Sequence, residues 1–134
     1  MKNHKYQHHR LTIQSAGSSE RYTGETDKAY GRVRGIFVLL PEPLLAVGSS
    51  LHLRVGGREI FDEQHDVRLL TCSQHVSPNQ RFFLFPEHIE AGGLSLEIKY
   101  RDGGQPGAVY PYDVKVYLWL SNDVREDAQE DAQV

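Results

Sequence analysis

A chain of 134 residues, 39% of them hydrophobic and 25% charged, is long enough for one globular domain with a core of its own. Its single cysteine, Cys72, excludes an intrachain disulfide and a cysteine-based zinc cluster. No apolar run approaches the ~18 residues that a membrane-spanning helix needs, and no apolar stretch follows Met1. We therefore expect no membrane span, no secretion by a signal peptide, and a location in the cytoplasm or in a virion.

The net charge of −3 is unevenly distributed along the chain. Residues 121–134 hold five acidic side chains and one arginine, a net charge of −4, which leaves 14 basic and 13 acidic side chains, a net charge of +1, for residues 1–120. Proteins that bind nucleic acid usually present a concentrated basic face. The near-neutral body of this chain therefore argues against a nucleic-acid partner.

The N-terminal part of the sequence is polar and weakly patterned. Residues 6–15 alternate loosely between apolar and polar side chains, which predicts an edge strand within an N-terminal arm of residues 1–15. Residues 16–31 collect Gly, Ser, Thr and Asp, and we interpret them as an extended loop. A loop of this length is uncommon in a compact domain unless it has a function or lies on a neighbour.

Residues 32–40 predict a strand that is apolar on both faces. The segment starts with alternating charged and apolar side chains, becomes continuously apolar from Ile36 to Leu40, and stops at Pro41. A half-buried sheet can bury only one face of such a strand, so Phe37 on the second face needs cover. We expect that cover to come from another part of this chain or from a second subunit.

Short strands and turns follow. Residues 51–55 alternate, and the Gly56-Gly57 pair after them favours a tight hairpin that sets Arg54 against Glu59.

Four further segments complete the middle of the chain. We predict a polar turn at residues 62–66, a strand at 66–72, a short apolar strand at 82–85 closed by Pro86, and one helical turn at 86–93. Proline at the first position, glutamate in the first turn and glycine at the end are the signals for that helical turn.

The clearest pattern in the sequence is the stretch from Leu94 to Leu120. Both of its ends alternate strictly between apolar and polar side chains, and a segment rich in Gly and Pro separates them. Folding this stretch into a hairpin about Pro106 would place the apolar side chains on one face and set Glu97 opposite Lys115 on the other. A shift of one residue would lose both features, so we expect the two strands to pair in this register.

These patterns predict seven or eight strands and little helix. We expect an all-β, single-domain antiparallel β-sandwich of jelly-roll type at residues 16–120, with an eight-stranded barrel as the alternative. The repeat E-D-A-Q-E-D-A-Q within residues 121–134 has no apolar face, which predicts an acidic C-terminal tail.

The sequence contains no phosphate-binding glycine loop, no paired-histidine zinc helix, no nucleophile elbow and no calcium loop. We therefore expect a protein that is not an enzyme and that holds no cofactor. One short segment does concentrate oxygen and imidazole groups that could bind a divalent cation: Asp62, Glu63, His65 and Asp66. Because this segment lacks the glycine of a calcium loop, we favour a solvated polar turn over a metal site.

Cys72, His75 and Asn79 have the residue types of a thiol nucleophile, its base and an orienting group. Their spacing alone does not establish such a site. Cys72 ends a predicted strand whose alternate residues are apolar, which favours a buried and unreactive thiol.

Aromatic residues are the strongest candidates for a binding surface. Tyr117 and Trp119 alternate with the apolar residues of the last strand, so they fall on the face that should be solvated. Exposed aromatic rings on a flat sheet either anchor a protein interface or stack against sugar rings, unless a loop or the N-terminal arm covers them. Tyr110, Tyr112 and Phe37 complete this set of interface or ligand-binding candidates.

These observations predict a non-enzymatic structural or assembly protein that self-associates. A small jelly-roll domain with polar terminal arms is the type of building block found in viral and phage particles, so other particle proteins are further candidate partners. The alternative is a β-sandwich module that binds carbohydrate or another ligand through its exposed aromatic rings.

Overall fold

The computed structural model describes residues 4–71 and 81–122. The Cys72, His75 and Asn79 set and the acidic tail beyond Asn122 lie outside the described residues. Within them, eight strands and two short 3₁₀ helices form the regular structure: β1 (His4–Ile13), β2 (Ser19–Glu25), β3 (Arg32–Leu39), η1 (Pro43–Ala46), β4 (Ser50–Val55), β5 (Arg58–Phe61), η2 (Val67–Leu70), β6 (Phe83–Glu90), β7 (Ser95–Arg101) and β8 (Tyr112–Ser121). No helix in this part of the chain is long and apolar enough to cross a membrane.

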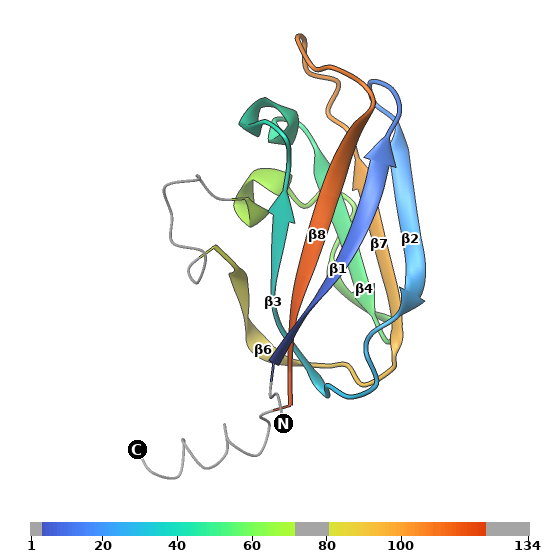
Figure 1. Ribbon diagram of the computed structural model, residues 1–134, viewed down its shortest axis with the longest axis vertical. Helices are drawn as coiled ribbons and strands as arrows, with labels where there is room; N and C mark the ends of the chain where they lie inside the picture. The colour runs from blue at the N-terminus through green and yellow to red at the C-terminus, as the bar shows by residue number, and fades with distance from the viewer. Residues whose placement is uncertain (1–3, 72–80, 123–134) are drawn as a thin grey trace.

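The strands form two four-stranded antiparallel sheets that pack face to face (Figure 1). We name the sheet with the order β1-β8-β3-β6 sheet A and the sheet with the order β2-β7-β4-β5 sheet B. The antiparallel pairs are nested along the chain: β1 with β8, β2 with β7, β3 with β6, and β4 with β5. This nesting, in which one long hairpin is rolled into two sheets, is the jelly-roll topology, and it confirms the predicted fold class.

The core lies between the two sheets and consists of alternate residues of the strands. On β8, Val114 and Val116 are fully buried, and on β7 Leu96 and Ile98 are at most 1% exposed. Burying one such aliphatic side chain is worth about 1.5–3 kcal/mol. The strands at both ends of the 94–120 stretch therefore bury the face that the sequence predicted.

The predicted pairing of that stretch is wrong, because β7 and β8 lie in different sheets. β7 pairs with β2 and β4, whereas β8 pairs with β1 and β3. Glu97 consequently lies near Arg21, with 3.7 Å between Oε1 and Nε, and not opposite Lys115. Strict alternation of apolar and polar residues shows which face of a strand is buried. Two strands paired in one sheet and two strands in opposite sheets show the same alternation, so the pattern does not reveal which strands are hydrogen-bonded.

Residues 16–31 contain strand β2, where the sequence predicted an extended loop. β2 is an edge strand of sheet B, and none of its residues is fully buried. Its sequence therefore shows no clear alternation of apolar and polar residues. The ladder of hydrogen bonds to β7 defines this strand instead.

The strand predicted after the polar turn is the 3₁₀ helix η2. Val67 and Leu70 are buried, whereas Leu69 is 63% exposed. Residues three apart share one face of a 3₁₀ helix, which explains this pattern. The carboxylate of Asp66 caps the helix by accepting a hydrogen bond from the backbone N–H of Arg68.

β6 continues through Pro86, so the predicted stop at this proline and the predicted helical turn after it are both wrong. β6 is the edge of sheet A, where a strand needs ladder hydrogen bonds on one side only. Its ladder with β3 is irregular at this point, and the flanking pairs are Leu84 with Gly35 and Ile89 with Val33. Pro86 falls in the irregular part, where a missing backbone N–H is tolerated.

Two local predictions are confirmed. β1 is an edge strand of sheet A, and the β4–β5 hairpin places Arg54 opposite Glu59. The turn between these strands uses Gly56 and Gly57 with φ angles of 60° and 81°. Glycine adopts this left-handed conformation without steric strain, which is why the pair marks the hairpin in the sequence.

Candidate functional site

Five aromatic side chains gather on the outer face of sheet A. They are Tyr6 from β1, Phe37 from β3, Tyr117 and Trp119 from β8, and Phe82 immediately before β6. The centroids of neighbouring rings lie between 5.3 and 6.3 Å apart, within the range in which aromatic pairs attract each other. We call these five residues the aromatic surface.

Strand register brings the rings of the aromatic surface together. Tyr6 lies opposite Trp119 on the β1–β8 ladder, and Tyr117 lies opposite Phe37 on the β8–β3 ladder. Gly35 occupies the position opposite Trp119 on β3. A Cβ atom at Gly35 would lie 2.8 Å from the backbone carbonyl oxygen of Phe83, so this glycine lets the segment that carries Phe82 lie close to β3.

The aromatic surface is partly open to solvent. Phe37 is only 8% exposed, because Tyr117 and Phe82 pack against it, whereas Tyr6 is 55% exposed. The second face of β3 is therefore covered by other parts of the same chain. Leu39 of β3 and Leu84 of β6 are 40% and 58% exposed, and they extend the apolar area beside the aromatic surface.

Basic and imidazole groups surround Trp119. Its indole N–H donates a hydrogen bond of 3.1 Å to Nδ1 of His4, and the guanidinium carbon of Arg34 lies 5.4 Å from the ring centroid. A cation over an indole face is attracted by the negative charge of the π system. His8 stacks on Tyr117 with 4.8 Å between ring centroids. Histidine and arginine side chains therefore lie next to the aromatic rings, and these side chains can also contact another protein surface.

The structure brings together three of the predicted interface candidates, namely Trp119, Tyr117 and Phe37. Sequence reasoning missed Tyr6 and Phe82. The loose alternation that predicted the N-terminal strand already placed Tyr6 on one face of it, but the neighbours of that strand were unknown.

Tyr110 and Tyr112 lie apart from the aromatic surface and are structural. Both hydroxyls donate hydrogen bonds to the carboxylate of Asp102, which is only 4% exposed. This carboxylate also accepts hydrogen bonds of 2.9 Å from the backbone N–H groups of Gly17 and Gly104. The network ties the loop between β7 and β8 to the turn between β1 and β2.

The pKa values of these groups follow from the same contacts. Burial alone would raise the pKa of Asp102, but its hydrogen bonds outweigh that effect and hold the pKa below its usual range. The hydrogen bond to Asp102 raises the pKa of Tyr110 to about 12. Burial and the hydrogen bond to Asp102 also raise the pKa of Tyr112. All three groups therefore keep one protonation state over the physiological range.

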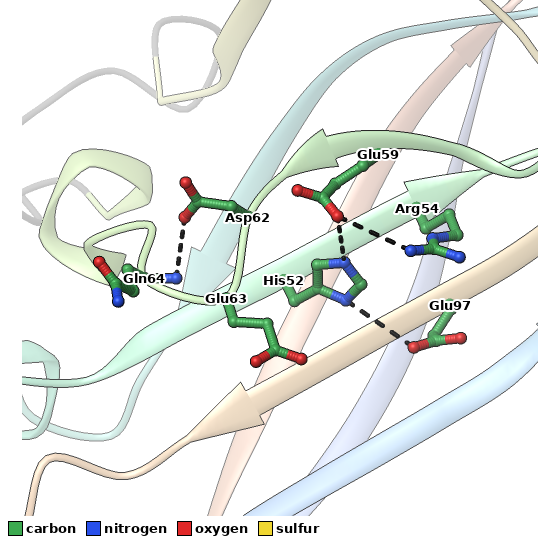
Figure 2. A pocket seen from close by; sticks show the side chains of 7 residues that line it. All are labelled: His52, Arg54, Glu59, Asp62, Glu63, Gln64 and Glu97. Carbon is green, nitrogen blue, oxygen red and sulfur yellow. Dashed lines mark hydrogen bonds and ion pairs between the residues drawn. The ribbon is translucent and has the colours of Figure 1, made fainter.

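The predicted metal-ligand cluster is divided by the fold. Asp62 and Glu63 line a pocket on the outer face of sheet B (Figure 2). His65 instead stacks on Phe61 with 3.9 Å between ring centroids. Asp66 forms an ion pair of 2.7 Å with Arg68. Among the described residues, no group of three or more His, Cys, Asp or Glu side chains is arranged to hold a metal ion.

The pocket in Figure 2 is centred on a buried histidine that sequence reasoning missed. Its lining consists of His52 and Arg54 from β4, Glu59 from β5, Asp62, Glu63 and Gln64 from the turn after β5, and Glu97 from β7. The alternation of residues 51–55 already placed His52 on the outer face. Its burial depends on glutamates from two other strands, which that alternation does not reveal.

No family model matches this sequence, and no curated protein matches it. A search of solved structures matched dimeric latent PorU from Porphyromonas gingivalis, with 11% sequence identity and a TM-score of 0.32. The similarity covers 87% of this chain and 13% of the PorU chain. At this TM-score the similarity supports no inference about function.

Proposed function

We propose that this chain is a non-enzymatic jelly-roll domain that self-associates through the aromatic surface on sheet A. The observation that carries the proposal is the presence of Tyr6, Tyr117 and Trp119 on a sheet face that would be polar in a solvated monomer. Aromatic residues and arginine are enriched at the centres of protein interfaces, where they supply much of the binding energy. Arg34 beside Trp119 adds the second of these residue types.

The narrower form of the proposal is that the copies build a particle of viral or phage type, together with other particle proteins. The jelly-roll topology supports this only as an architecture, because one fold serves many functions. In this form of the proposal the protein is found in the virion or in the cytoplasm where particles assemble.

The test is the oligomeric state of the full chain, measured by size-exclusion chromatography with light scattering from low to high micromolar concentration. We expect oligomers that dissociate on dilution. Tyr6→Glu places a charge in the aromatic surface and should abolish association. Val109→Glu is the matched control, because Val109 is 78% exposed in the β7–β8 loop and lies outside that surface. A strict monomer, or equal effects of the two variants, would contradict the proposal.

The alternative function is carbohydrate binding on the same surface. It is favoured by the stacking of Tyr6 on Phe82, with an interplanar angle of 23°, in which Tyr6 is still 55% exposed. Trp119 is the only tryptophan, so its fluorescence reports binding directly. A saturable change on adding oligosaccharides to a monomeric protein would favour this alternative over self-association.

A further inference from the structure

The outer face of sheet B carries a pocket that the aromatic surface does not use (Figure 2). It has a volume of about 480 Å³, and its polar lining comes from three strands and one turn. The lining holds four carboxylates, from Glu59, Asp62, Glu63 and Glu97, against the single guanidinium of Arg54. Four negative charges and one positive charge give a formal net charge of −3 with the histidine neutral.

His52 lies buried at the base of this pocket without a hydrogen bond. Its side chain is 5% exposed, and neither ring nitrogen has a hydrogen-bond partner. The nearest carboxylate oxygens are Oε2 of Glu59, 3.6 Å from Nε2, and Oε1 of Glu97, 3.8 Å from Nδ1. Both distances exceed the length of a hydrogen bond. Buried polar groups are normally paired, so this exception points to a missing partner.

The glutamates around His52 are also incompletely satisfied. Glu59 lies 3.7 Å from Arg54, and Glu63 lies 3.8 Å from Lys99. Charge-assisted hydrogen bonds are usually about 2.7–2.9 Å long, so these ion pairs are loose. Within the described residues, Glu59, Glu63 and Glu97 have charged neighbours, but no hydrogen bond to their carboxylates is formed. The pocket therefore offers more acceptors than donors, because four carboxylates face one guanidinium, one amide and one imidazole.

We propose that this pocket binds a donor-rich organic cation, namely the guanidinium or ammonium group of a basic side chain or of a small amine. Such a group would donate to Glu59, Glu63 and Glu97 and offset the negative charge of the lining. An imidazole with one N–H accepts at its other nitrogen, so the cation would donate to that nitrogen of His52, and the carboxylates of Glu59 and Glu97 remain the acceptors nearest the ring. A guanidinium fits best, because its planar fork can bind a carboxylate through two parallel hydrogen bonds.

The surroundings of the pocket restrict where the cation can lie. An adjacent hollow of about 210 Å³ shares His52 and Glu63, but Lys99 and Arg101 also line it. These basic groups repel a cation from Glu63, so Glu59 and Glu97, which flank His52, would be its main acceptors. Free amines and arginine side chains present the same chemistry, so the experiment must distinguish the two sources.

The test is a titration of the full chain with methylguanidinium at constant ionic strength, followed by the NMR signals of the His52 imidazole. We expect saturable shifts with methylguanidinium and none with methylurea, its neutral counterpart. Glu59→Gln should weaken binding about tenfold or more, because it removes one charged acceptor. Glu87→Gln is the matched control, since Glu87 pairs with Arg58 on an exposed surface outside the pocket. The fold of each variant is checked from the same spectra.

A second titration identifies the source of the cation. Tighter binding of the tripeptide Gly-Arg-Gly than of methylguanidinium supports a protein segment as the ligand, whereas equal binding supports a small amine. The proposal is overturned if methylguanidinium leaves the His52 signals unchanged or if methylurea shifts them equally. It is also overturned if Glu59→Gln binds like the parent protein, or if only a divalent metal ion gives saturable shifts.

Discussion

The side chain of Asp102 links several segments at one end of the sandwich. Its buried carboxylate accepts hydrogen bonds from the hydroxyls of Tyr110 and Tyr112 and from two backbone N–H groups. The loop between β7 and β8 must carry the chain from sheet B to sheet A. This network therefore holds in place the loop through which the chain passes from one sheet to the other. Because of this passage, β7 and β8 cannot pair as a hairpin.

Asp102→Asn should lower the free energy of unfolding by about 2–3 kcal/mol, because the amide removes the charge and presents its own N–H groups to four donors. Tyr110→Phe removes only one of these hydrogen bonds and should cost about 1 kcal/mol. Urea denaturation of both variants measures the difference. Equal losses would show that the carboxylate has no special role.

His9 makes stability depend on pH. Its ring stacks on Tyr22 with 4.0 Å between centroids, and burial, together with the charge of His8, lowers the pKa of His9 from 6.5 to about 4. The unfolded chain therefore binds a proton at higher pH than the folded protein does. It follows that the free energy of unfolding falls as the pH is lowered from 6.5 to 4.

His9→Phe keeps a stacked ring and removes the titrating group, so its stability should fall less steeply over this pH window. Burial also lowers the pKa of His65, which acts in the same direction, so the slope should decrease without disappearing. Thermal unfolding of the variant and the parent at a series of pH values measures the two slopes. Parallel slopes would contradict the assignment to His9.

At the scale of elements, the close approach of β3 and β6 depends on Gly35. A Cβ atom there would lie 2.8 Å from the backbone carbonyl oxygen of Phe83, closer than real contacts allow. Gly35→Ala should therefore force the strands apart and cost about 1–3 kcal/mol. Gly31→Ala is the matched control, because its nearest neighbour is 3.8 Å away. Chemical denaturation of the two variants tests this, and similar stabilities would refute the steric argument.

The elements predicted best from the sequence are those whose residue pattern is compatible with only one local structure. Alternation in β7 and β8 shows which residues enter the core, and Gly56-Gly57 marks a hairpin because its backbone angles suit glycine. The pairing of β7 and β8 was predicted wrongly, because alternation does not specify which strand is the neighbour. The same limit explains why Tyr6 and Phe82 were missed from the aromatic surface.

Short and polar elements were the hardest to predict. β2 is held by its ladder to β7 and contains no fully buried residue, and η2 is marked only by the three-residue spacing of Val67 and Leu70. The pocket around His52 was missed for a related reason. Its carboxylates come from β5, β7 and a turn, and only the fold brings these segments together.

At the scale of the whole molecule, the two sheets present outer faces of different chemistry. Contacts through the aromatic surface would be mainly apolar, whereas the pocket on sheet B would recognise charge. Salt screens exposed charges over about 10 Å at 0.1 M and leaves apolar contacts largely intact. Added sodium chloride should therefore weaken methylguanidinium binding and leave self-association unchanged or stronger. Light scattering and NMR titrations over one salt series measure both, and oligomers that dissociate in salt would indicate a charged interface.

The central position of β8 has a consequence for the order of events during synthesis. β8 pairs with both β1 and β3, and it supplies Tyr117 and Trp119. Until this strand has left the ribosome, sheet A lacks the central strand that joins β1 to β3. The jelly roll must therefore complete its folding after β8 emerges, and a nascent chain cannot display the aromatic surface to other copies before its own fold is finished.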